Sequence, residues 1–143
     1  MQGGDNVDFT EAILRKLKSC PLLKKHGVTA VGFAGMDAKK RSMSILNTKG
    51  ELVVEEHIDG GCDMQYPFAL LYRSLGTDTA DKLAAQKLID EVADWLTAPE
   101  NRPSAEGFDV QRLKRADPCT LISEDETGAD FQGSFTLEYY KEG

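Results

Sequence analysis

The sequence predicts an α+β domain, with a mostly antiparallel sheet and helices packed on one face. Two stretches indicate this class. In residues 64–73, large apolar side chains alternate with other residues, which is typical of a strand with one buried face. In residues 79–96, apolar residues recur at the spacing of a single helical stripe. Because each apolar surface needs a partner, we expect the helix to lie across the sheet in a two-layer domain.

The predicted core joins these two surfaces to a third. In residues 131–139, apolar and polar side chains again alternate, as in a strand with one buried and one solvated face. The residues expected at the centre of the core are Tyr66, Phe68, Leu70, Leu88, Val92, Trp95, Phe135 and Leu137.

A first helix is predicted at residues 9–19. Asp8 and Glu11 have the spacing of a capping box, and apolar residues follow at helical intervals until Pro21. We expect residues 1–7, which precede this helix, to be disordered. Glycines interrupt residues 22–36, which favours an irregular, partly extended connection.

A three-stranded meander is predicted next. Met43 and Ile45 alternate as in a strand, and residues 47–50 form a turn sequence that ends in glycine before the alternation resumes at Leu52. A second turn at residues 59–61 leads into the strand around Tyr66. These two turns would join three antiparallel strands in sequence order.

After the long helix, the chain is expected to return to the sheet. Pro99 and Pro103 stop helical propagation. A strand is then predicted from Phe108 onward, continuing past Pro118 to Ile122, and the last strand follows. The sequence shows no internal repeat and no domain boundary, so residues 1–143 are expected to form a single domain with two or three strands at its end.

Composition argues against several classes of partner. The chain has 17 basic and 24 acidic residues and a net charge of -7, which disfavours attraction to nucleic acid or anionic lipid. We expect neither sequence-specific nucleic-acid binding nor a membrane partner, since no apolar run reaches the length of a membrane span. Cys20, Cys62 and Cys119 are odd in number and widely spaced, which argues against a disulfide framework or a zinc site. We expect a soluble protein made in the cytoplasm.

No motif supports an enzyme, a cofactor or a metal. The sequence contains no Walker loop, no dinucleotide-binding glycine motif and no Gly-x-Ser-x-Gly elbow, and its two histidines lack the spacing of a metal site. One turn offers a nucleophile near a base, because Cys62 follows two glycines and His57 lies five residues earlier. His57 is out of phase with the apolar residues of its strand, so we expect it to face solvent. We therefore predict no catalytic, cofactor-binding or metal-binding residue, and a small Cys-His hydrolase or ligand-binding domain stays an alternative.

The acidic run at residues 124–130 carries Glu124, Asp125, Glu126 and Asp130. Clustered carboxylates suit hard cations such as calcium. The run lacks the alternating positions and the closing glutamate of an EF-hand loop, and it lies between two strand-like segments. A solvated hairpin loop is therefore the better interpretation.

Four short motifs carry a resemblance to a known family. They are Glu56-His57-Ile58-Asp59-Gly60-Gly61, Gln65-Tyr66-Pro67-Phe68-Ala69-Leu70, the helix end Asp94-Trp95-Leu96, and Leu137-Glu138-Tyr139-Tyr140. Taken in this order, the chain resembles the small minor capsid or tail-terminator (head-tail joining) proteins of siphophages and prophages of Gram-positive bacteria.

The resemblance implies an α+β subunit that assembles with itself as a ring, hexameric in our expectation, on the end of the tail tube. Its partners would be the tail tube and the head-connector proteins, in the virion and, during assembly, in the cytoplasm of the bacterial host. No catalytic residue carries over from this family. In such a ring the loop with Glu124, Asp125, Glu126 and Asp130 is our candidate for a channel-facing or assembly position, because acidic side chains would repel passing DNA. A minor capsid protein elsewhere in the particle is the alternative within the same class.

Overall fold

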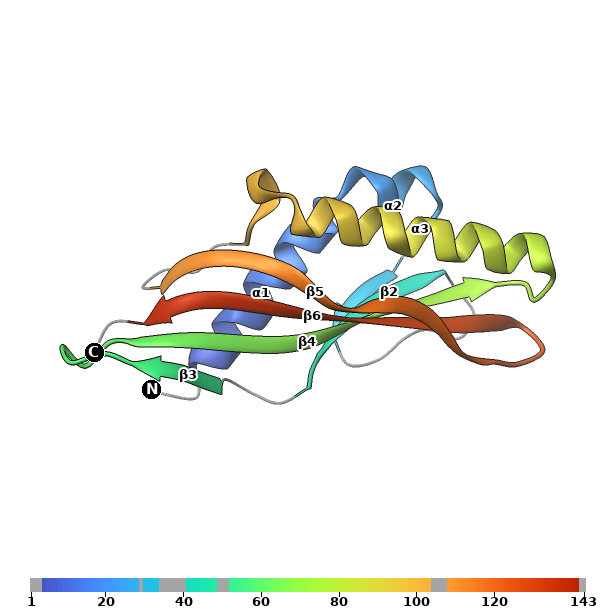
Figure 1. Cartoon of the computed structure of the whole chain (residues 1–143). Coiled ribbons are helices and arrows are strands. Elements are labelled where there is room, and N and C mark those ends of the chain that lie inside the picture. The colour runs from blue at the N-terminus through green and yellow to red at the C-terminus, as the bar shows by residue number, and fades with distance from the viewer. Residues whose placement is uncertain (1–3, 29, 34–40, 49–51, 104–107, 142–143) are drawn as a thin grey trace.

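In the part of the chain that the structure describes, six strands form one mixed sheet, and three α-helices pack against it (Figure 1). The computed structural model describes residues 4–28, 30–33, 41–48, 52–103 and 108–141. The elements are α1 (Gly4–Lys18), α2 (Pro21–Lys25), β1 (Ala30–Phe33), β2 (Ser42–Asn47), β3 (Leu52–Glu56), β4 (Cys62–Leu75), α3 (Thr79–Thr97), the 3-10 turn η1 (Pro99–Asn101), β5 (Phe108–Glu124) and β6 (Gly128–Lys141). The predicted α+β class is confirmed.

The sheet is built around the pair of long strands β4 and β6. The strand order is β1-β2-β4-β6-β5, and β3 also pairs with β4. The β4–β6 pairing runs without irregularity from Cys62 opposite Lys141 to Leu75 opposite Gly128. Every pairing is antiparallel except that of β1 with β2.

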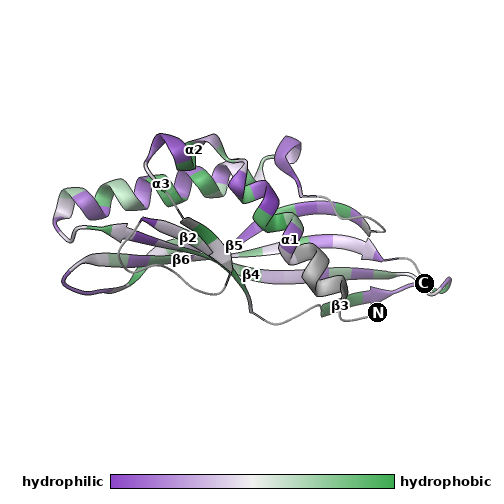
Figure 2. Cartoon of the chain, turned by 180° about the vertical axis from the view of Figure 1, so that it is seen from behind, coloured by the Kyte–Doolittle hydropathy of each residue, from purple (hydrophilic) through white to green (hydrophobic). Residues whose placement is uncertain are grey.

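The core lies between one face of this sheet and the helices. All the predicted core residues are buried except Trp95, which is half-buried at its edge. Phe68 and Phe135 are direct cross-strand partners, and their rings stack with centroids 5.4 Å apart. Figure 2 shows hydrophobic and hydrophilic residues interspersed along α3, as expected of a helix with one buried face.

The long helix α3 matches its predicted bounds within one residue. The carboxylate of Asp78 accepts a hydrogen bond from the backbone N–H of Asp81 at 2.8 Å, which caps the first turn. Gly76, just before this cap, has φ +87°, a conformation that glycine adopts without strain. No helix in the described ranges is long and apolar enough to cross a membrane.

The first helix begins earlier than predicted. It starts at Gly4, so Asp8 lies inside α1, and residues 4–7 of the segment expected to be disordered are helical. Residues 1–3 lie outside the described part of the chain.

The connection predicted at residues 22–36 contains regular structure. Pro21 stands at the first position of the short helix α2, where its missing N–H costs no hydrogen bond. The chain leaves α2 through Gly27, at φ +75°, and forms β1 parallel to β2. Of the glycines that suggested irregularity, Gly27 follows a helix and Gly32 lies within a short strand. Residues 29 and 34–36, which include Gly35, lie outside the description.

The prediction of a hairpin at residues 47–50 is wrong. β2 and β3 lie one after the other along the same side of β4, both antiparallel to it, so the chain does not reverse between them. The N–H of Thr48 still donates to the carbonyl of Pro67 at 3.2 Å, which continues the ladder beyond β2. With 14 residues, β4 is long enough to pair with both. Of the two turns predicted for the meander, the one at residues 59–61 forms a hairpin, between β3 and β4. Lys49 and Gly50 are not among the described residues.

Candidate functional site

The acidic run forms the tight turn that joins β5 to β6. The backbone N–H of Asp125 donates to the carbonyl of Gly128 at 2.9 Å. One carboxylate oxygen of Asp125, Oδ1, accepts the backbone N–H groups of Thr127 at 2.9 Å and Gly128 at 3.1 Å. The prediction of a hairpin loop is confirmed, and these bonds order the turn from within.

A buried arginine lies beneath this turn. The side chain of Arg73, on β4, is only 4% exposed. Its Nη2 donates to Asp125 Oδ1 and to Thr127 Oγ1, both at 2.7 Å, and its Nη1 donates to the carboxylate of Asp130 at 3.3 Å. The Arg73 guanidinium is the main cause that holds the pKa of the Asp125 carboxyl well below its usual range. We call Arg73, Asp125, Thr127 and Asp130 the turn cluster.

Gly128 allows the close packing of this turn against β4. A Cβ at Gly128 would lie 2.1 Å from the carbonyl oxygen of Ser74 and 3.1 Å from Nε of Arg73. Because the nearest of these atoms belongs to the backbone, a larger residue would force the two strands apart. The glycine therefore lets Arg73 lie under the loop.

Cations next to the loop neutralise part of its negative charge. Glu124 pairs with Lys82 on α3 at 2.8 Å, and Glu126 is exposed with no ion pair to any other described residue. The four predicted loop carboxylates, set against Arg73 and Lys82, have a net charge of −2. Whether this loop faces a channel stays a prediction.

The charge of Asp125 is expected to make stability depend on acid pH. Its pKa is lower in the folded protein than its ordinary value of 3.8, so this contribution is complete above that value and is lost as the pH falls below it. Replacement of Asp125 by Asn keeps the acceptor oxygen and removes the charge. Urea unfolding between pH 7 and pH 3 should show a smaller acid loss in this variant than in the wild type. Glu126→Gln is the matched control, because the Glu126 carboxylate has no described partner. If Asp125→Asn and the wild type lost equal stability at acid pH, the contribution assigned to the Asp125 charge would be contradicted.

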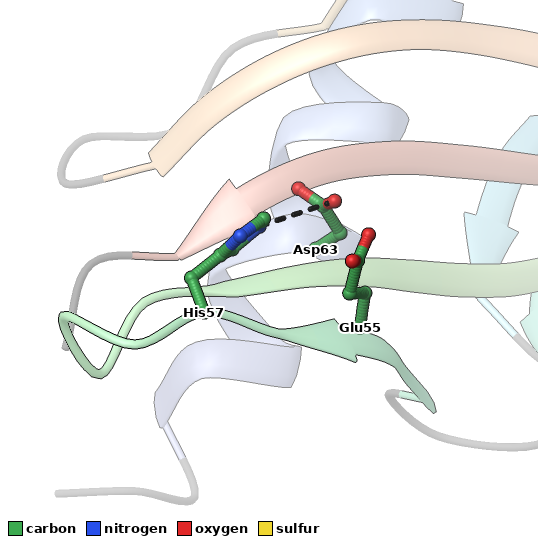
Figure 3. A group of neighbouring side chains, drawn as sticks. All are labelled: Glu55, His57 and Asp63. Atoms are coloured by element: carbon green, nitrogen blue, oxygen red, sulfur yellow. Dashed lines mark ion pairs between the residues drawn. The ribbon is translucent and has the colours of Figure 1, made fainter.

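The β3–β4 hairpin brings together Glu55, His57 and Asp63 (Figure 3). A register irregularity after Val53 places Glu55 directly opposite Asp63, and like charges at such positions repel each other. Nε2 of His57 lies 3.2 Å from Oδ2 of Asp63. One potential ligand atom from each of the three residues lies within 4.8 Å of the others, so the group could in principle hold a cation. All three are at least partly exposed, and Nε2 of His57 is within ion-pair distance of Asp63, so a protonated imidazole would reduce the repulsion.

The hairpin does not favour the Cys-His interpretation. His57 contacts Asp63 and lies 5.7 Å, between ring centroids, from Tyr140. Asp63 and Cys62 are successive strand residues, so their side chains point to opposite faces of the sheet. The imidazole therefore lies with the groups on the face away from the thiol. His57 is partly exposed, in line with the expectation that it faces solvent.

Sequence reasoning missed Arg73 and Lys82. Arg73 occupies a position that the alternation assigns to the face away from the core, where a charged residue is ordinary. The only signal was the acidic turn itself, which had no cationic partner in its neighbourhood along the chain. The pairing becomes visible once the β4–β6 register places Arg73 opposite Asp130.

Comparison with known proteins identifies the fold and no family. No protein-family model matches the chain, and no curated protein matches its sequence. A chain in the solved structure of the virion of a native gene transfer agent (GTA) particle is similar to it, with a TM-score of 0.66 and 17% sequence identity over 94% of both chains. The two chains share a fold.

Proposed function

We propose that this protein is a structural component of a virion and, within that class, a tail-terminator or head-tail joining subunit. The observation that carries the proposal is the fold likeness over 94% of both chains to a chain of a GTA virion. The short motifs that resemble siphophage minor capsid and tail-terminator proteins support it independently. The subunit would form a ring on the tail tube and contact the head-connector proteins, within the virion and beforehand in the host cytoplasm.

The described residues are compatible with a role that makes and breaks no bonds. The turn cluster orders the β5–β6 turn through ion pairs, and in the β3–β4 hairpin His57 contacts Asp63, so both of these polar clusters hold local structure together. We therefore propose a non-enzymatic protein that works through surface shape and charge.

The acidic turn is suited to a position along a DNA path. It retains a net negative charge, and Arg73 fixes its backbone, so its shape would persist next to a moving polyanion. Repulsion of the DNA backbone would limit adhesion during passage. Glu126, which is exposed and without an ion pair among the described residues, would point the charge outward.

Deletion of the gene in a phage that carries it tests the proposal. Loss of a terminator removes the signal that ends tube growth, so electron micrographs should show overlong tails and heads without attached tails. Complementation with the wild-type gene should restore uniform, joined tails. Tails of normal length joined to heads in the deletion strain would end the terminator interpretation.

A further inference from the structure

The β3–β4 hairpin presents an apolar and acidic surface that nothing in the described chain covers. Every residue of β3 is exposed, with Val53 at 56% and Val54 at 58%, and Ile58 beyond the strand is fully exposed. The acidic side chains beside them are Glu55, Glu56, Asp59 and Asp63. We call these residues the acidic hairpin. Exposed β-branched residues with a charged surround are typical of an interface core and its rim.

The outer edge of β3 has fewer of the features that keep sheet edges apart than the edge strand β5, although it has one register irregularity, after Val53. In the described part of the chain β3 pairs with β4 alone. The edge strand β5 carries Pro118, basic residues and four register irregularities, all of which discourage pairing with another chain. Leu52, Val53 and Val54 offer no proline and no lysine. The edge of β3 is therefore more open to pairing with a partner chain than the edge of β5.

A second surface on the same chain has the opposite charge. Arg15, Lys16 and Lys18 end α1, and Lys24 and Lys25 end α2. None of these five side chains has an ion pair with another residue in the described ranges. Pro21 is exposed and Leu22 half-buried among them, which adds apolar area. We call these residues the basic corner.

The acidic hairpin and the basic corner lie on different parts of the molecule. Figures 1 and 2 both show β3 near the end of the sheet where α1 begins, whereas α2 lies in the helical layer at the far end of α1. One chain therefore cannot bring its own two surfaces together. The hairpin carboxylates of Glu55, Glu56 and Asp59 have no ion pair with another described residue and are complementary in charge to the five cations of the basic corner. This complementarity favours a copy of this chain as the partner of each surface.

We infer that the acidic hairpin of one subunit docks on the basic corner of the next. Contact between two different patches is the head-to-tail arrangement that closes into a cyclic ring. The apolar residues Val54 and Ile58 would lie at the centre, and the carboxylates around them would meet the lysines of the neighbour. A groove of about 370 Å³ with Val54 and Asp63 on its wall adjoins the hairpin and leaves room for a long side chain. The inference deepens the proposed ring and takes its cyclic symmetry from that proposal.

Charge reversal on each surface tests the contact in the purified full chain. Glu55→Lys/Glu56→Lys leaves the acidic hairpin with two lysines and two carboxylates, so its net negative charge is lost. Lys24→Glu/Lys25→Glu leaves the basic corner with three cations and two carboxylates, so most of its positive charge is lost. In sedimentation velocity at low salt, the wild type should self-associate at high concentration, and each variant alone should do so about tenfold or more weakly. An equimolar mixture of the two variants should associate again, because the unchanged acidic hairpin of one variant then meets the unchanged basic corner of the other.

A separate variant tests the apolar centre of the proposed contact. Ile58→Ser changes a fully exposed residue, so the melting temperature should stay within about 2 °C of the wild type while self-association weakens. Leu83→Ser, at an exposed site on α3, is the control that should change neither.

Zero-length carboxyl-to-amine cross-linking decides between a second copy and another occupant. A mixture of isotopically light and heavy chains at about 1 mM should yield mixed light-heavy peptides that join residues 55–59 to residues 15–25. Absence of these mixed peptides, or cross-links of the hairpin to other virion proteins only, would overturn the inference. If the cross-links form and the gene-deletion phage still makes normal tails, the interface stands and the terminator role fails. Overlong tails without the cross-links would support the terminator role and overturn the proposed interface.

Discussion

Replacement of Phe68 or Phe135 by alanine is expected to lower the free energy of unfolding by about 3–5 kcal/mol. Both rings are about 1% exposed and stack on each other across β4 and β6 at the centre of the sheet. Each truncation removes an aromatic side chain from a close-packed core and leaves a cavity that the two long strands cannot readily close. This loss is a large share of the stability of a domain of this size.

Urea unfolding of both single variants and the double variant measures the effect. The double variant should be more stable than the sum of the two losses predicts, because the stack itself contributes about 0.5–1.5 kcal/mol and can be lost only once. Leu83→Ala, at a site 66% exposed, should stay within about 0.5 kcal/mol of the wild type. A cooperative transition with an unchanged midpoint in Phe135→Ala would show that the buried face of the sheet lies elsewhere.

The parts of the fold predictable from sequence are those with an uninterrupted pattern. The alternation around Tyr66 and Phe135 and the stripe on residues 79–96 each continue through many residues, and the structure places them as β4, β6 and α3. Each element buries one face of its own, so its periodicity records burial directly. The core residues predicted from these patterns are accordingly buried, with Trp95 only half-buried.

The incorrect fold predictions concern pairing between segments that are distant in the sequence. The turn sequence at residues 47–50 resembles a hairpin turn, but β2 and β3 both pair with β4, and a local turn signal carries no information about that choice. β1 was missed because it has only four residues and pairs in parallel with β2. A strand this short shows no pattern of its own, so only its partner reveals it.

The same difference between local sequence patterns and long-range pairing applies to the candidate surfaces. The acidic turn was predictable because its residues are contiguous, whereas Arg73 became its partner only through the register of β4 with β6. The acidic hairpin likewise depends on a register irregularity that sets Glu55 opposite Asp63. The sequence thus indicates which charges exist, and the pairing decides which of them are already neutralised and which remain for a partner.

Replacement of Arg73 by methionine is expected to disorder the β5–β6 turn. Methionine fills part of the same buried space but leaves the carboxylates of Asp125 and Asp130 without their cation, which is the costly way to break a buried pair. Because Asp125 is 59% exposed, water takes over part of the lost interaction, so the turn should loosen while β4 and β6 stay paired. Backbone N–H groups of Thr127 and Gly128, which donate to Asp125, should exchange with solvent about tenfold or more faster.

Lys82→Met is the matched control for this variant. It removes the other cation next to the loop, but the Lys82 side chain is 32% exposed and its pair with Glu124 is at the surface, where such pairs contribute about 0–1 kcal/mol. Its melting temperature should therefore fall much less than that of Arg73→Met, and exchange at Thr127 and Gly128 should stay near the wild-type rate. Equal exchange rates in Arg73→Met and the wild type would mean that the turn is held by its backbone alone, and the channel-facing role proposed for its fixed charges would lose its physical basis.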